Sequence, residues 1–473
     1  MTMSRPTLSS RQRWLILSAT SLGAFSALLG FIAVPIALPT MANELNLGLS
    51  TVQWVLTSFL VISAATMLPL GSAGDILGRL KILILGFILL IVGMGYTAIA
   101  QGIGGLIFAR VVQGLGAAML MVSGPAIATS SLPESERGRA VGVVTMGGFL
   151  ASGIGPILGG FVTQHLGWRW IFYMNIPPAV IGLVLATQLR GLVPPGNRRP
   201  FDIKGAVSLA VFLSSAVIGI GHGQEEGWKP AHTFEHILPL GILALLSLGA
   251  FIFVEKRAAQ PMLPLSLFKN KSFTTNNICN GILHMAMLMV SILIPFYLQG
   301  VLGIPAARMG LLYAPMSVTL SLMAIPSGWL YDRYGSKKLC AGAMAAGTLV
   351  LFSYMTLDPG DGYAAILPRM IGAGVTLGLF VTPNVSAIFG SAPREHLGVA
   401  SGTEQTSRQF GHALGAVLAA AISGRYLQDG QQTLGGNAFM AAFYDTTFVS
   451  ALLMGIGVFF ALQRRETTLF KRA

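Results

Sequence analysis

The sequence predicts an all-α, polytopic membrane protein built from two parallel six-helix bundles and an inserted helix pair. Three observations support this fold class. Only 10% of the 473 residues are charged and 53% are hydrophobic, and the mean hydropathy is +0.70, which a protein with a water-facing surface could hardly reach. Apolar stretches long enough to cross a bilayer recur along the whole chain. A pattern around Asp75 returns around Asp332, which indicates an internal duplication.

The apolar stretches, each of about 18 to 25 residues, have the length that a bilayer core requires of a helix, and we count fourteen of them. The predicted spans are 14–38, 51–72, 82–100, 104–127, 140–165, 171–189, 205–223, 237–254, 273–298, 309–330, 340–357, 363–388, 400–424 and 443–463.

The basic residues are distributed unevenly among the loops between these spans. If the N-terminus is cytoplasmic, most of the 30 Lys and Arg fall in cytoplasmic segments. The positive-inside rule therefore places both termini in the cytoplasm of a protein of the cytoplasmic (inner) membrane. The formal net charge of +13 then reflects membrane topology, and we expect no nucleic-acid partner.

The duplication divides the chain. GSAGDILGRLK, 71–81, matches GWLYDRYGSKK, 328–338, and the first six spans match the last six in order and orientation, whereas the seventh and eighth have no counterpart. This predicts an N-terminal bundle at 1–190, a linker with two extra spans at 191–260 and a C-terminal bundle at 261–473. Parallel six-helix repeats are one architecture of secondary transporters, which bind substrate between the halves near the midplane.

Three motifs in matching spans resemble the signatures of the major facilitator superfamily: the 71–81 turn, RVVQG at 110–114 and GIGPILGG at 153–160. The span count, GWRWIFYMNIP at 167–177 and TSRQFGHALG at 406–415 are similar to its fourteen-helix drug:proton antiporter branch. The resemblance implies the major facilitator fold. It also implies an efflux transporter that exports amphipathic or toxic small molecules by exchange with protons, through alternating access.

The 71–81 turn has a physical role that does not depend on the resemblance. A carboxylate there can sit against the positive end of a neighbouring helix or pair with a basic residue, and the contact can break when that helix moves. The resemblance implies that the turn locks the outward-facing state. The residues that match the pattern are Gly71, Asp75, Gly78, Arg79 and Lys81. The copy retains Asp332 but has Ser336 in place of Arg79, so we expect a weaker lock there. Basic residues that merely enforce topology remain the alternative.

Arg110 in the fourth span and Arg369 in the twelfth are candidate functional charges. A charge at membrane depth costs about 2.5 to 3.5 kcal/mol on insertion scales, so it should face a cavity or a partner unless it snorkels to the interface, as both could. Gly114 and Gly116 leave room beside Arg110, and its match to the family motif implies proton coupling. The repeat and the resemblance place the first, fourth, ninth and twelfth spans around the substrate cavity, to which we assign Gln113 and Arg369.

Small residues recur in the fifth span, where the antiporter motif contains Gly155, Pro156, Gly159 and Gly160. Such residues let helices approach closely, and Pro156 frees a backbone carbonyl and permits a bend. Close packing alone accounts for the glycines. The resemblance adds the direction of transport, which is outward.

Glu404 is the acidic residue that lies clearly within a predicted span, and Arg408 follows at i+4 on the same face. The pair either offsets its own burial or supplies a titratable carboxylate for proton coupling. Family members typically carry an aspartate in the first span, where this chain has Gly30. An exporter of anionic or neutral amphiphiles (lipid or organic acid), with weak or no proton coupling, is therefore one alternative. A non-transporting membrane sensor or scaffold is another.

The ninth span carries a polar stripe at a spacing of three and four residues, formed by Asn277, Asn280 and His284. Polar groups cannot face lipid cheaply, so this stripe should line the substrate cavity. His284 either helps in proton coupling or is a hydrogen-bonded interior histidine.

No motif of an intramembrane enzyme, such as HExxH, occurs in the sequence. The two cysteines, Cys279 and Cys340, lie in predicted spans, which excludes a disulfide framework and a thiolate metal cluster. We therefore expect no catalytic residues, no metal and no cofactor. The expected partners are an amphipathic small molecule, protons and the lipid bilayer, and the expected state is a monomer.

Overall fold

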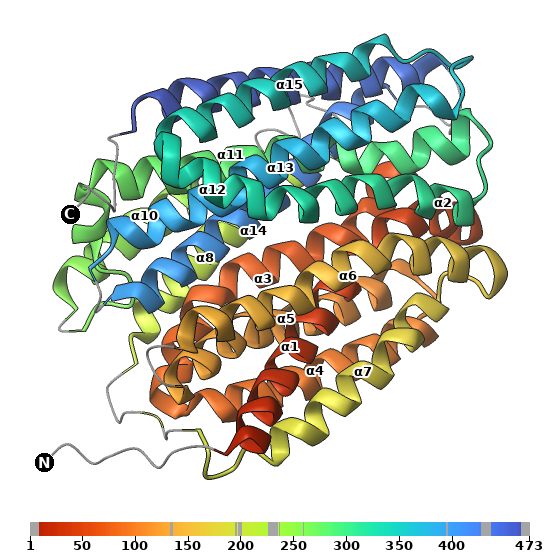
Figure 1. Ribbon diagram of the computed structural model, residues 1–473. Coiled ribbons are helices and arrows are strands. Elements are labelled where there is room, and N and C mark those ends of the chain that lie inside the picture. Colours follow the sequence, from red (N-terminus) through yellow and green to blue (C-terminus); the bar gives the residue numbers. More distant parts are fainter. Residues whose placement is uncertain are drawn as a thin grey trace, which may run out of the picture.

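The computed structural model describes residues 9–132, 136–193, 196, 201–225, 235, 237–258, 260–393, 396–426 and 437–464, which are almost wholly helical (Figure 1). Up to residue 190 the helices are α1 (Ser10–Ile32), α2 (Val34–Leu45), α3 (Leu49–Leu77), α4 (Arg79–Ile99), α5 (Ile103–Ser131), α6 (Arg137–His165) and α7 (Trp170–Thr187). They are followed by α8 (Ile203–Glu225), α10 (Leu238–Arg257), η3 (Leu265–Lys269), α11 (Lys271–Phe296), η4 (Tyr297–Val301), α12 (Ala306–Ser353), η5 (Tyr354–Thr356), α13 (Tyr363–Ser391), α14 (Leu397–Tyr426) and α15 (Asn437–Leu462).

Two glycines with left-handed backbone angles mark the internal repeat. Gly78 (φ +102°) separates α3 from α4, and Gly335 (φ +78°) divides α12 into two arms. Glycine adopts such angles without the steric cost that other residues pay. The two turns therefore share a conformation as well as a sequence pattern. They lie at one end of the molecule, which we call the turn end, and the opposite end is called the far end (Figure 1).

Twelve helical segments of the described chain are long and apolar enough to cross a membrane, so the protein is a multi-pass membrane protein. The predicted spans 309–330 and 400–424 are not among the twelve, although they lie in the first arm of α12 and in α14. Within α14, Glu404, Arg408 and Arg425 lower the apolarity of a helix already rich in small and polar residues. The predicted count of fourteen is therefore not confirmed by length and composition.

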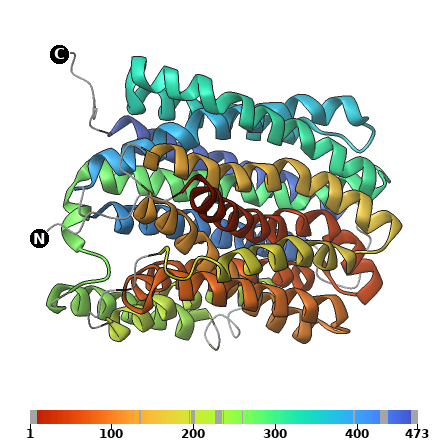
Figure 2. The same ribbon diagram turned by 60° about the horizontal axis from the view of Figure 1, so that its bottom comes forward.

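The helices gather into two bundles, as two views of the ribbon show (Figure 1, Figure 2). In the first bundle α1, α3, α4, α5, α6 and α7 pack on one another, and in the second α11 to α15 do the same. Between the bundles α3 packs against α14, and α6 packs against α12. The domain boundaries at 190 and 261 stay predictions.

The helices between the bundles pack on their seam. α8 contacts both α3 and α14, and α10 packs chiefly against α8. The apolar cluster that joins them includes Ala65, Leu68, Leu209, Leu213 and Phe251. The α8–α10 pair thus touches both bundles rather than extending either one.

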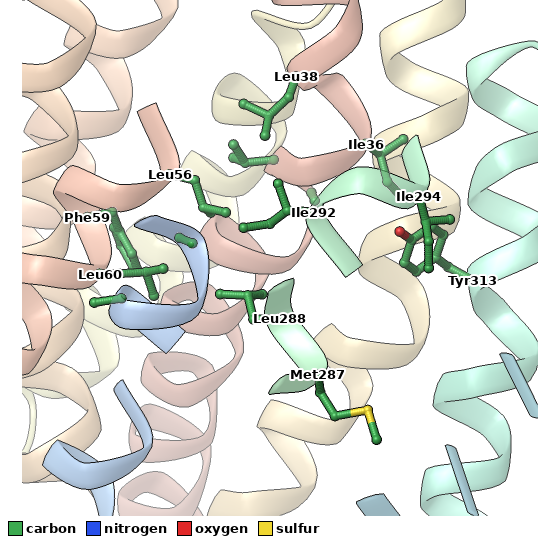
Figure 3. Close-up of a cluster of buried hydrophobic side chains, with 14 of the residues drawn as sticks. Ile36, Leu38, Leu56, Phe59, Leu60, Met287, Leu288, Ile292, Ile294 and Tyr313 are labelled. Atoms are coloured by element: carbon green, nitrogen blue, oxygen red, sulfur yellow. The ribbon is translucent and has the colours of Figure 1, made fainter. Parts of the chain in front are cut away.

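Apolar side chains close the space between the bundles toward the far end (Figure 3). We call this set the far-end seal: Ile36 and Leu38 of α2, Leu56 and Leu60 of α3, Leu288, Ile292 and Ile294 of α11, and Tyr313 of α12. All are buried. Gln299 reinforces the seal by donating a hydrogen bond from Nε2 to the carbonyl oxygen of Ile36 (3.1 Å). Water is therefore kept out between the bundles at this level.

Candidate functional site

A polar cluster lies on α11 and α14 within the second bundle. Glu404 and Arg408, one turn apart on α14, form an ion pair with 3.6 Å between Oε1 and Nη1. Asn280 on α11 donates from Nδ2 to the backbone oxygen of Glu404 (3.0 Å) and to its Oε1 (3.4 Å). The side chain of Glu404 is 7% exposed and that of Arg408 is 25% exposed. The carboxylate is thus nearly enclosed, whereas the guanidinium reaches more open space.

Two histidines extend this cluster toward the first bundle. Nδ1 of His284 lies 2.9 Å from the carbonyl oxygen of Asn280, and Nδ1 of His412 lies 3.1 Å from Oε1 of Gln409. The two imidazole rings meet at 76° with centroids 5.0 Å apart. His412 also stacks on Phe31 of α1 at 5.5 Å. The polar cluster, defined as Asn280, His284, Glu404, Arg408 and His412, therefore reaches across the boundary between the bundles.

The structure brings together four of the predicted site residues here and adds His412, which the sequence prediction missed. The signal was present, because 404, 408 and 412 follow one another at intervals of four and share one face of a helix.

Close packing of α11 on α14 sets the geometry of the cluster. A methyl group on Gly411 would collide with the carbonyl oxygen of Gly281, and one on Gly415 with that of Met285. The predicted cavity residue Asn277 belongs to this interface, since Oγ of Ser407 donates to its carbonyl oxygen (2.6 Å). Its own Nδ2 bonds the backbone of α11, and its Oδ1 is buried without a hydrogen-bond partner in the described chain.

Arg110 and Gln113 form a separate buried network inside the first bundle. Arg110 donates from Nε to the carbonyl oxygen of Val55 (2.8 Å) and from Nη1 to that of Gly30 (3.0 Å) and to Oε1 of Gln113 (2.7 Å). Its guanidinium lies 4.4 Å from the ring centre of Phe59. The side chain is fully buried, and among the described residues no carboxylate pairs with it. Arg110 thereby ties α1 and α3 to α5.

Gly30 occupies the position at which the resemblance leads us to expect an aspartate. Its carbonyl oxygen accepts the hydrogen bond from Arg110, and a methyl group there would lie 3.3 Å from Nδ2 of Asn175. Backbone oxygens therefore take over the contact with the buried guanidinium. The roles of Arg110 and Gln113 in coupling and substrate binding stay predictions.

Arg369 has local partners at the far end of the second bundle. It donates from Nε to the carbonyl oxygen of Ser353 (2.9 Å), from Nη2 to Oγ1 of Thr356 (2.8 Å), and from Nη1 to the carbonyl oxygen of Ala365. These bonds cap the end of α12 and η5, and they do not join Arg369 to the polar cluster.

The structure shows the contacts of some of the predicted turn residues. Asp75 binds Arg79 (Nε to Oδ1, 2.8 Å), and Arg79 also donates from Nη1 to the carbonyl oxygen of Ala126 on α5 (2.9 Å). Space around Gly71 is open, and Lys81 lies in the first turn of α4, which begins at Arg79. The side chain of Asp332 lies outside the described part of the structure, so its predicted weaker lock is not tested.

The glycines of α6 allow close contact on two sides. A methyl group on Gly159 would lie 3.1 to 3.3 Å from Ala33, and one on Gly155 would meet Leu29 and Ile32. On the other side, a methyl group on Gly160 would collide with the carbonyl oxygen of Ala306 on α12. The carbonyl oxygen of Pro156 in turn approaches Gly310. Further toward the far end, Oε1 of Gln164 accepts a hydrogen bond from the backbone N–H of Ala307 (2.9 Å).

Two membrane-embedded bundles with a polar cluster at their boundary and an apolar seal beside it define the class of membrane transporters. The chain belongs to the Major Facilitator Superfamily, whose family model matches residues 20–416. It is therefore a transporter and not an enzyme.

Relatives agree with this membership, and solved structures share the fold. The chain is 28% identical over 450 residues to the riboflavin transporter RibZ of Clostridioides difficile (strain 630), covering 95% of this chain and 96% of that protein. It is 30% identical over 436 residues to the multidrug transporter protein MdtP of Bacillus subtilis (strain 168), covering 91% and 79%. A crystal structure of the peptide transporter POT in complex with sulfate shares the fold, with a TM-score of 0.67 at 16% identity over 97% of this chain and 98% of that one.

Proposed function

We propose that the protein is a secondary active efflux transporter whose two bundles alternate in giving each side of the membrane access to the polar cluster. In this proposal fourteen helices span the cytoplasmic membrane, α8 and α10 are an inserted pair, both termini and the turn end face the cytoplasm, and the chain acts as a monomer. The observation that carries the proposal is the contact of His412 with Phe31, which joins the polar cluster to the opposite bundle beside the seal. The sealed far end then corresponds to a state closed to the outside.

Glu404 is the proposed coupling carboxylate. In this proposal a proton on Glu404 and a substrate bound at the polar cluster exclude one another, which is the thermodynamic requirement for exchange. On the cytoplasmic side substrate binding releases the proton, and on the outer side protonation releases the substrate. Arg408, 3.6 Å away, is the charge partner of this carboxylate in the structure.

The names of the relatives support an organic substrate. One is a multidrug transporter and another a riboflavin transporter. We therefore propose amphipathic or toxic small molecules as the exported class.

A second candidate is an exporter of anionic or neutral amphiphiles with weak or no proton coupling. The observation that favours it is the first bundle's interior, where Gly30 stands in place of an acid and Arg110 is paired with carbonyl oxygens. The positive charge of this buried guanidinium favours an anionic substrate over a cationic one in the neighbouring space.

Transport by purified protein in proteoliposomes under an imposed pH gradient separates these candidates. We expect Glu404→Gln to abolish gradient-driven accumulation of an anionic amphipathic fluorescent probe such as carboxyfluorescein while retaining exchange of probe across the membrane at zero gradient. Asp445→Asn is the matched control, because Asp445 bonds Tyr426 outside the polar cluster. Unchanged gradient-driven transport by Glu404→Gln means that Glu404 does not couple protons. If the rate of export by the wild type does not depend on the pH gradient, the second candidate is supported.

A further inference from the structure

We propose that the site between the bundles takes a planar aromatic ring, neutral or anionic, in a slot between Phe31 and His412. This inference rests on the proposed transport function and names the substrate class of the same site.

A row of rings crosses the boundary between the bundles. Phe59 on α3 and Phe31 on α1 lie nearly parallel, at 8° with centroids 6.1 Å apart. Phe31 and His412 are stacked at 30° with centroids 5.5 Å apart. His284 presents its ring nearly at right angles to His412 on the other side. The row changes bundle at a single place, between Phe31 and His412.

This crossing point is a contact between two ring faces. α14 packs closely against α3, α8, α11 and α15, but in the described chain it forms no extended backbone contact with α1. Movement of one bundle away from the other therefore opens the Phe31–His412 contact, and the described parts of α1 and α14 have no close helix packing to lose at that point. A planar ring that enters gains two stacking partners in place of the single contact that it displaces.

Both walls of the slot are supported from behind. Phe59 backs Phe31 and is itself covered by the guanidinium of Arg110 at 4.4 Å. His412 is oriented by Oε1 of Gln409 and by the edge of His284. Walls that hold their orientation lower the ordering cost of binding, so the slot selects a flat ring over a globular apolar group.

The charges beside the slot select against cations. The carboxylate of the polar cluster, Glu404, is already engaged by Arg408 and by Asn280. Arg408 is 25% exposed and retains donors for a carboxylate or carbonyl on the substrate. Arg110 adds a second positive charge behind Phe59. Neutral and anionic rings therefore fit, whereas a planar cation has no free carboxylate to meet among the described residues of the cluster.

Two carboxylates of equal charge and different shape test this slot. Anthracene carboxylate is flat, adamantane carboxylate is globular, and binding of each to the detergent-purified full-length protein is measured by isothermal titration calorimetry. We expect the wild type to bind the flat compound more tightly. Phe31→Leu and His412→Leu should each raise the Kd for anthracene carboxylate by roughly three- to tenfold, as expected for the loss of one ring pair, and leave adamantane carboxylate unchanged.

Two control variants distinguish loss of the slot from misfolding of the protein. Phe31→Tyr keeps the ring and should stay within about twofold of the wild type for both compounds. Phe108→Leu removes an exposed aromatic residue on α5, away from the slot, and should change neither Kd. Elution of each variant at the wild-type position on size exclusion confirms an intact fold.

The outcomes separate the slot from the proposed transport function. Equal affinity of the wild type for the flat and globular compounds, or equal losses for both in Phe31→Leu and His412→Leu, overturns the slot. Export of both carboxylates at equal rates from wild-type proteoliposomes also overturns it while leaving efflux standing. Failure of the wild type to export any probe overturns the proposed function, and the calorimetry still decides the slot.

Discussion

Arg110 is a fully buried cation whose neighbours are neutral oxygens. Its guanidinium donates hydrogen bonds to Gly30 of α1, Val55 of α3 and Gln113 of its own helix. Lysine carries the charge but has no planar fork, so it cannot keep these three directions at once. We expect Arg110→Lys to lower the midpoint of thermal unfolding in detergent by several degrees and to reduce transport, because at least one buried carbonyl loses its donor.

Arg369→Lys is the control for this prediction. Arg369 also donates to three acceptors, but it is partly exposed at the far end, where water can replace a lost bond. Its unfolding midpoint should fall by less. Equal shifts for the two variants mean that Arg110 is not a structural tie between helices.

The Glu404–Arg408 pair and Arg110 differ in how far their contacts could be predicted from the sequence. The Glu404–Arg408 pair was predictable because i+4 spacing on a helix is a local property, and the structure confirms the ion pair. The bonds of Arg110 to Gly30 and Val55 were not, because carbonyl oxygens of other helices carry no side-chain signature. The stacking of His412 on Phe31 joins residues of two bundles, so no local pattern announces it.

At the scale of the element, α6 depends on having no side chain at Gly160. The carbonyl oxygen of Ala306 on α12 lies where a methyl group would be placed. Because a backbone atom cannot move aside alone, we expect Gly160→Ala to separate α6 from α12 at the far end, with a loss of about 1 to 3 kcal/mol of stability. Gly153→Ala adds the same methyl group on α6 where nothing lies within 4 Å, and should be neutral.

Thermal unfolding and transport measured on both variants check this expectation. A Gly160→Ala protein with wild-type stability and transport would show that the α6–α12 contact can accommodate a methyl group, contrary to its geometry. The sequence predicted close packing at Gly155, Gly159 and Gly160, and that prediction is confirmed. It did not predict which helix packs there, since α12 is distant in sequence. The packing of α8 against α3 and α14 was not predictable either, because these helices are also distant in sequence.

For the whole molecule, alternating access requires that the far end opens when the turn end closes. α6 and α12 run past each other from one end of the molecule to the other. Distances between these two helices therefore show whether each end is open or closed. At the far end Gln164 touches the backbone of Ala307. At the turn end, positions 142 and 328 are glycines with open space around them. Cysteine pairs at 164/307 and at 142/328, in a background with Cys279→Ala and Cys340→Ala, therefore measure the two closures independently.

We expect a short thiol cross-linker to join the far-end pair readily in purified protein without substrate, and the turn-end pair slowly. Cross-linking of the far-end pair should stop transport in proteoliposomes, and reduction should restore it, because the bundles can then separate again. A gradient that drives the outward-facing state should reverse the two cross-linking rates. Rates that stay fixed under the gradient, or transport that continues with the far-end pair joined, would contradict a rocking motion of the bundles about the polar cluster.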